Sequence, residues 1–295
     1  AWLPYLRHTA LEVAQQETLF STLKARLTDI EPYAIDPDEE DEAPEGSASP
    51  WEDDRITGRL DGVRIHVQMR PDGAEAWIDC PALPPDGHME IGSDNMVLTG
   101  DLDFDGSIGL RGDGVRWRSL LSADIRAELM AFLRTDGCRV ACDRQRLRVR
   151  VKVDDPNVFK ERLSRAIHLA RALGAVHAQP LSTRLWEALR STSDPAVRAR
   201  LLQDLAALPD EREAAIEHGR NDPTLKVRLM AATLASPPDA AFIREVIASP
   251  DTPRSLLLPA IDALLECAPE DVVFVRETLM AIVSGDDALL QDEAR

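Results

Sequence analysis

The sequence predicts a two-part protein: an α+β domain of antiparallel strands with two covering helices, followed by an all-α domain of repeated helical pairs. Three observations support this prediction. Residues 55–82 alternate apolar and polar side chains with period two, as half-buried strands do. Helix-type spacing with helix caps follows between 122 and 174. From Leu181 onward strand patterns cease, and a helix-opening motif at Asp194 returns 28 residues later at Asp222.

Length and composition are consistent with this organisation. A chain of 295 residues suggests about two domains, each able to bury a core. The formal net charge of −18 repels phosphate backbones, so we do not expect a nucleic-acid partner. Four cysteines are too few for a secreted disulfide framework, which favours a reducing, cytoplasmic location. No apolar run is long enough to predict a transmembrane segment.

The first 54 residues predict a helix and then a linker. Residues 1–30 form the expected N-terminal amphipathic helix, because apolar residues such as Leu6, Val13 and Leu23 recur at helical spacing. Residues 31–54 contain 11 acids, no Lys or Arg and several prolines. Such a segment has little to bury, so we expect an acidic disordered linker.

The α+β domain is expected over residues 55–174. Turn signals at Asp61-Gly62 and Pro71-Asp72-Gly73 divide 55–82 into a three-stranded meander. Short strands are expected near Met89 and Ile108, and a helix capped by Ser122 over 122–134. A hairpin over 138–153 follows. The last element is a helix with Asp155 as N-cap, Pro156 at its first position and Gly174 just past its end.

The segment 181–295 is expected to form helical pairs. Asp194-Pro195-Ala196-Val197-Arg198 aligns with Asp222-Pro223-Thr224-Leu225-Lys226, and a degraded copy starts at Asp251-Thr252-Pro253. In each copy we expect the Asp to cap a helix and the Pro to occupy its first position. The pattern resembles the second helix of HEAT and armadillo-type repeats over residues 181 to about 283. The resemblance implies a binding surface without naming its ligand, and an ordinary helical bundle is the alternative.

One acidic stretch resembles a calcium-binding loop. Asp101, Asp103 and Asp105 alternate ahead of Gly106, as in the first half of an EF-hand loop. The twelfth position, which should be a bidentate Glu, is Gly112. The sequence therefore favours an acidic turn between strands, with these three aspartates as the ligands if calcium binds.

A basic stretch is the second candidate site. Residues 134–174 contain 11 Lys plus Arg against 5 Asp plus Glu. We expect an anion-attracting or partner-binding surface centred on Arg146, Arg148, Arg150 and Lys152. The outward basic residues of the hairpin and the helix after it are Arg139, Arg146, Arg148, Arg150, Lys152, Lys160, Arg162 and Arg165. A solvated strand face is the alternative.

The sequence contains no recognisable catalytic triad, zinc cluster or phosphate loop. We therefore expect a non-enzymatic adaptor that binds a protein partner through its helical repeats and its basic surface, without a cofactor. The alternative is an enzyme or a ligand- or calcium-regulated module with a site near Asp101–Asp113 or between the domains. The identity of the partner and the oligomeric state stay open.

Overall fold

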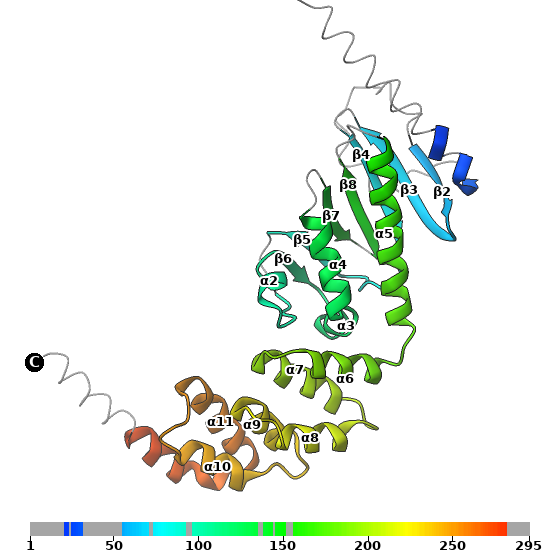
Figure 1. The fold of residues 1–295 in the computed structure, drawn as a ribbon. Helices are drawn as coiled ribbons and strands as arrows, with labels where there is room; N and C mark the ends of the chain where they lie inside the picture. The colour runs from blue at the N-terminus through cyan, green and yellow to red at the C-terminus, as the bar shows by residue number, and fades with distance from the viewer. Residues whose placement is uncertain are drawn as a thin grey trace, which may run out of the picture. The chain divides into compact units, whose positions relative to one another are not determined.

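An eight-stranded antiparallel sheet organises the first part of the chain, in the order β1-β2-β3-β4-β8-β7-β5-β6 (Figure 1). The computed structural model describes residues 21–23, 25–31, 55–70, 73–92, 96–134, 138–143, 145–151 and 156–281. Most of the expected N-terminal helix and nearly all of the expected acidic linker lie outside these residues. The strands are β1 Thr28–Glu31, β2 Arg55–Leu60, β3 Val63–Arg70, β4 Gly73–Asp79, β5 His88–Ile91, β6 Ile108–Arg111, β7 Cys138–Asp143 and β8 Arg146–Val151.

The expected meander is confirmed as β2, β3 and β4. Leu60 pairs with Val63 across the first turn, whose two central residues both have positive φ, 51° at Asp61 and 82° at Gly62. Asp and Gly tolerate this left-handed conformation, which matches the twist of a two-residue hairpin. The expected short strands near Met89 and Ile108 are also present, as β5 and β6.

The centre of the sheet joins strands that are far apart in sequence. β4 pairs with β8, so that Trp77 lies opposite Arg148 and Ile78 opposite Leu147. β8 also pairs with β7 in the expected hairpin, and β7 in turn pairs with β5. The first-half meander and the later hairpin therefore form one continuous sheet.

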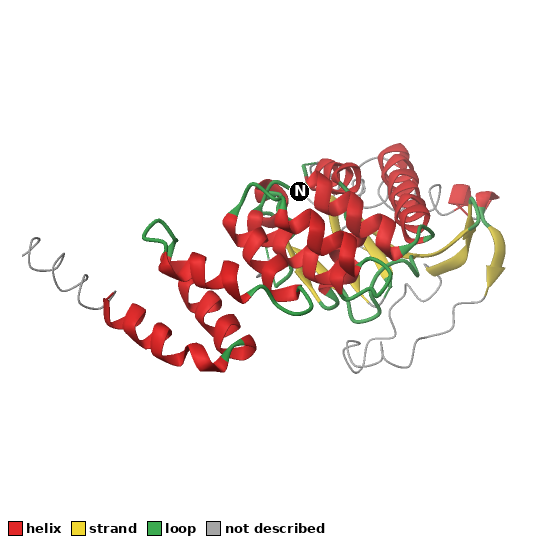
Figure 2. Ribbon diagram, turned by 90° about the horizontal axis from the view of Figure 1, so that it is seen from below, coloured by secondary structure: helices red, strands yellow, loops and turns green. Residues whose placement is uncertain are grey.

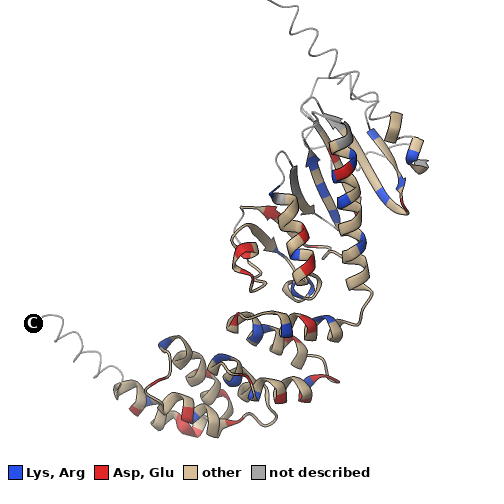
Figure 3. Cartoon of the chain, viewed as in Figure 1, with Lys and Arg blue, Asp and Glu red and all other residues tan. Residues whose placement is uncertain are grey.

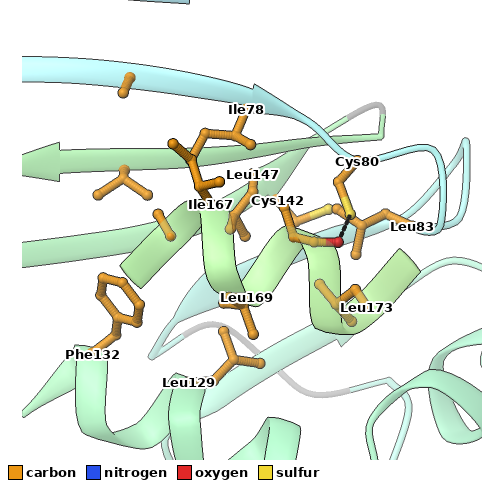
Figure 4. Packing of buried hydrophobic residues seen from close by; sticks show 14 of the residues in the cluster. Ile78, Cys80, Leu83, Leu129, Phe132, Cys142, Leu147, Ile167, Leu169 and Leu173 are labelled. Atoms are coloured by element: carbon orange, nitrogen blue, oxygen red, sulfur yellow. Dashed lines mark hydrogen bonds between the residues drawn. The ribbon is translucent and has the colours of Figure 1, made fainter. Parts of the chain in front are cut away.

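Two helices cover one face of this sheet, α4 Ala123–Leu133 and α5 Pro156–His177. Their apolar sides pack with those of the central strands, as Figure 4 shows for Ile167 of α5 beside Ile78 and Leu147. Ser122 caps α4 as expected, because its side chain accepts a hydrogen bond from the Ile125 N–H. The sheet face that bears Ile78 and Leu147 is therefore the core face.

Four local differences separate this unit from the expectations. The chain is strand rather than helix or linker at Thr28–Glu31. Two short helices were not expected: α2 Leu102–Asp105 lies in a stretch expected to contain only turns and strands, and α3 Gly114–Leu120 follows that stretch. α5 passes through Gly174 and ends at His177, because the half-buried Val176 still packs on the core. The predicted end of α5 was therefore wrong.

The described chain divides into two compact units, residues 1–184 and 185–295. Among the described residues strands occur only in the first unit, and the second is built of helices (Figure 2). The helices from the division onward are α6 Leu181–Ser191, α7 Pro195–Ala206, α8 Arg212–Arg220, α9 Leu225–Leu234, α10 Ala240–Ala248, α11 Arg254–Cys267 and the 3-10 turn η2 Pro269–Asp271. Residues 272–281 are also helical.

The helices of the second unit pack mainly on their sequence neighbours and on alternate helices. α7 packs on both α8 and α9, and α10 packs on α11. Asp194 caps α7 as expected, accepting from the Ala196 and Val197 N–H groups. The same cap was wrongly predicted for the other two copies: α9 begins at Leu225 after Thr224, and α11 follows Pro253. Asp222 instead accepts from the N–H and hydroxyl of Thr224.

Candidate binding site: the outer face of the sheet

The side of the sheet turned away from α4 and α5 is polar, and we call it the outer face. It arises from strand alternation: Ile65, Ala76 and Leu147 point to the core, so their sequence neighbours point the other way. The register aligns these outward residues across four strands. They are Arg55, Thr57 and Arg59 of β2, Arg64, His66 and Gln68 of β3, Glu75, Trp77 and Asp79 of β4, and Arg146, Arg148 and Arg150 of β8.

Arginine dominates the charge of the outer face. The residues above include six arginines and two carboxylates, whereas the whole chain has a net charge of −18. Three of the arginines follow each other at alternate positions of β8, which carries blue bands in Figure 3. The outer face is therefore locally positive on an acidic protein.

A buried carboxylate positions the central arginine. Glu75 is fully buried, with 0% of its side chain exposed, and it accepts from the Nε of Arg148. The Arg148 guanidinium lies 6.0 Å from the centre of the Trp77 ring, and its own side chain is half exposed. Arginine on an aromatic face within about 6 Å gains cation–π attraction. Glu75 and Trp77 therefore hold a charged, accessible guanidinium in a defined place.

A second polar chain crosses the outer face. The Thr57 hydroxyl lies 2.9 Å from the His66 Nδ1, and the His66 Nε2 lies 3.9 Å from the Asp79 Oδ1. Asp79 also lies 3.6 Å from the Nε of Arg146. This order of hydroxyl, imidazole and carboxylate is that of a catalytic triad, but Thr57 is only 3% exposed, so its hydroxyl is not open to solvent in this structure. We interpret this row of polar side chains as a cross-strand link that joins four strands.

The structure divides the residues of the expected basic surface between two layers. Arg146, Arg148 and Arg150 share one face, while Lys152 lies outside the described residues. Lys160, Arg162 and Arg165 belong to α5, which covers the opposite face, and Arg165 stacks over Phe132 at 4.9 Å. The single surface expected from residues 134–174 is therefore wrong, because the segment spans both layers of the unit.

Sequence reasoning also missed half of the arginines on the outer face. Arg55, Arg59 and Arg64 lie on β2 and β3, between 82 and 91 residues before β8 begins at Arg146, and come into line only through the pairing of β4 with β8. Their alternation with buried residues was visible in the sequence. The strand order, which decides what lies beside them, was not.

Two of the three aspartates proposed for calcium, Asp101 and Asp105, use their side chains in separate hydrogen-bond groups. Asp101 caps α2, accepting from the Phe104 N–H, and its other oxygen is 3.2 Å from the Nε of Arg126. Asp105 accepts from the N–H groups of Thr99 and Gly100 and from the Thr99 hydroxyl. The Asp103 main-chain carbonyl accepts from the Ser107 hydroxyl. In the described part of the chain no three His, Cys, Asp or Glu side chains gather as metal ligands would.

Hydrogen bonds also determine the acidity of Asp101. Burial alone would raise the pKa of this carboxyl, but the Phe104 N–H and the Arg126 guanidinium outweigh it and hold the pKa below its usual value. Asp101 therefore stays ionised as a helix cap.

Comparison with known proteins adds no assignment: no family model, curated protein sequence or solved structure matches the chain.

None of the described helices combines the length and the apolar character that a membrane-crossing helix needs.

Proposed function

We propose that this protein is an adaptor that binds an acidic segment of a partner protein on the outer face of its sheet. The observation that carries the proposal is the row formed by Arg146, Arg148 and Arg150, flanked by Trp77 and by the arginines of β2 and β3. Guanidinium groups bind carboxylates with two parallel hydrogen bonds, and a row on one strand presents them at regular intervals. An extended acidic chain has a matching repeat of side chains.

Charge favours a short acidic protein segment over nucleic acid. The outer face attracts anions only locally, since fields from exposed charges are screened beyond about 8 Å at physiological salt. A long phosphate polymer would also meet the acidic remainder of the protein, whose net charge is −18. A partner segment of a few residues need contact only the arginines.

We further propose that the second unit is a stack of HEAT-like helical pairs that provides a second protein-binding surface. The spacing of its helices supports this. α7, α9 and α11 begin at residues 195, 225 and 254, intervals of 30 and 29, and α6, α8 and α10 begin at 181, 212 and 240, intervals of 31 and 28. Regular intervals of this kind are typical of helical-repeat proteins.

The test measures binding of a fluorescently labelled Asp/Glu-rich peptide by anisotropy at low and physiological salt. The variant is Arg146→Gln/Arg150→Gln, which leaves Arg148 in place because its loss would strand the buried Glu75. Each exposed charge pair contributes about 0–1 kcal/mol, so we expect roughly three- to tenfold weaker binding and a smaller salt dependence.

The matched control is Lys160→Gln/Arg162→Gln, which removes the same charge from α5 on the opposite layer. It should bind the peptide nearly as wild type does. Equal loss in both variants would mean that net charge alone attracts the peptide, and the proposed outer-face site would be rejected.

A further inference from the structure

A buried arginine without a carboxylate partner lies in the first unit. Arg184 is only 7% exposed, and its Nη1 donates to the Ser119 hydroxyl at 3.1 Å. The Nε of Arg184 is sealed from solvent and has no acceptor among the described residues. Burying a charged group is costly unless a counter-charge and hydrogen bonds compensate. Arg184 therefore lacks the compensation that a buried guanidinium ordinarily has.

Two further basic side chains lie close to Arg184. Arg116 of α3 donates from its Nε and Nη2 to the main-chain carbonyls of Ala82 and Pro81. Burial, followed by the charges of Arg116 and Arg184, lowers the pKa of His177 at the end of α5. Burial and the charge of Arg116 also lower the pKa of Arg184. Within the described chain no carboxylate forms an ion pair with any of the three, and all belong to the first unit.

We infer that Arg184, Arg116 and His177 form a binding site for a small oxyanion, such as phosphate or sulfate. This site is separate from the outer face. The edge of the Arg184 guanidinium formed by Nε and Nη2 is the edge that binds oxyanions in a bidentate manner. Ser119 holds the opposite edge, through Nη1, and donates its own hydroxyl to the Arg116 carbonyl. Ser119 is thus a positioning residue that orients the free edge of Arg184.

Of the residues in this group, His177 is exposed, whereas Arg184 and Ser119 are buried. The Nη2 of Arg184 has no acceptor within the described chain, so an anion beside the imidazole would accept a hydrogen bond from it. The guanidinium would have to turn before Nε, which is sealed from solvent, could donate to the same anion. The bound charge would then offset the mutual repulsion of Arg116 and Arg184.

The test uses the full chain and sulfate, which stays dianionic across the titration range of histidine. The imidazole pKa of His177 is measured by NMR with sulfate and with chloride at equal ionic strength. We expect sulfate to raise the pKa of His177, because a nearby negative charge favours the imidazolium. The rise should saturate with sulfate concentration, and the same dependence should appear in the thermal midpoint of the protein.

Variants separate this site from the outer face. Arg184→Gln should abolish the sulfate-dependent rise, and Arg184→Lys, which keeps the charge without the fork, should weaken sulfate affinity by about tenfold. Arg146→Gln/Arg150→Gln and the exposed Arg276→Gln should respond as wild type does. A His177 pKa that does not move with sulfate, or that moves equally in Arg184→Gln, would overturn the inference. The His177 measurement on the wild type decides the case even if Arg184→Gln does not fold.

Discussion

The Arg198 guanidinium in α7 donates from Nη2 to the Oδ1 of Asp222 at 2.8 Å and so ties α7 to the turn that precedes α9. The same oxygen accepts from the N–H and the hydroxyl of Thr224. Both partners are largely buried, with 16% and 5% of their side chains exposed. The two copies of the sequence motif are therefore joined by a shared, desolvated ion pair.

Removing one partner of this pair should destabilise the second unit, and the double variant should cost less than the sum of the two single variants. Asp222→Ala leaves Arg198 buried without its counter-charge, a change that costs about 3–5 kcal/mol in comparable pairs. Arg198→Ala should cost less, since Thr224 still donates to Asp222. Hydrogen exchange of the α7 and α9 amides measures these local free energies. Strict additivity in the double variant would show that the pair is not coupled.

Acid should weaken the same link. Burial alone would raise the pKa of Asp222, but the Thr224 hydrogen bonds and the charge of Arg198 outweigh it, and the pKa lies below its usual value. Because the folded pKa is depressed, the stabilisation is present above about pH 4, the ordinary aspartate value, and is lost as the pH falls through the lower folded pKa. In Asp222→Asn, amide exchange in α9 should lose this acid dependence. If amide exchange in α9 of this variant keeps the same acid dependence, titrating groups other than Asp222 cause it.

Two glycines in helices should respond in opposite ways to alanine. A Cβ at Gly219 of α8 would lie 2.5 Å from the Leu202 Cδ2 and 2.8 Å from the Ala231 Cβ, so α8 could not keep its approach to α7 and α9. We expect Gly219→Ala to destabilise the second unit by about 1–3 kcal/mol despite better helix propensity. Gly174 of α5 has nothing within 4 Å, so Gly174→Ala should stabilise the first unit by about 0.5–1 kcal/mol. Thermal and urea unfolding compare the two, and equal effects would contradict the packing argument.

Thiol reactivity should report the burial of the sheet core. Burial raises the pKa of Cys80 from its ordinary 9.0 to about 11, and Cys142 is also buried, whereas Cys267 is partly exposed. At pH 8 such a thiol is about a hundredfold less ionised than one of pKa 9.0, before steric protection is counted. In a Cys138→Ser background, a thiol reagent should label Cys267 first, and Cys80 and Cys142 only after unfolding. Prompt labelling of all three would contradict the packing in Figure 4.

The elements that local chemistry decides were predictable from the sequence. The turn at Asp61-Gly62 needs two positive φ angles, and the caps at Ser122 and Asp194 satisfy helix N–H groups within three residues. The end of α5 was not predictable, since Val176 extends the helix through a contact with the distant core rather than through a local signal. The capping aspartates Asp101 and Asp113 could have indicated α2 and α3, but the glycines around them favoured turns.

The candidate site was only half predictable for a similar reason. Alternation placed Arg146, Arg148 and Arg150 on one face of a strand, and that placement depends on local backbone geometry alone. Whether Lys160 and Arg162 join them depends on which face α5 covers, and whether Arg59 and Arg64 join them depends on strand order. Both are properties of the tertiary structure. A charge count over a continuous segment cannot separate the two layers.

The pairing of β4 with β8 has a consequence for how the protein is made. β8 ends at Val151, so a nascent chain that has released only β2, β3 and β4 lacks the strand that completes the middle of the sheet. Contacts between residues this far apart in sequence form late, because a long loop must first be closed. β4 ends at Asp79 and β8 ends at Val151, so about 70 further residues must leave the ribosome before β8 can pair with β4. During this time the β4 edge of the meander is unpaired. Until then that edge is open to pairing with another chain.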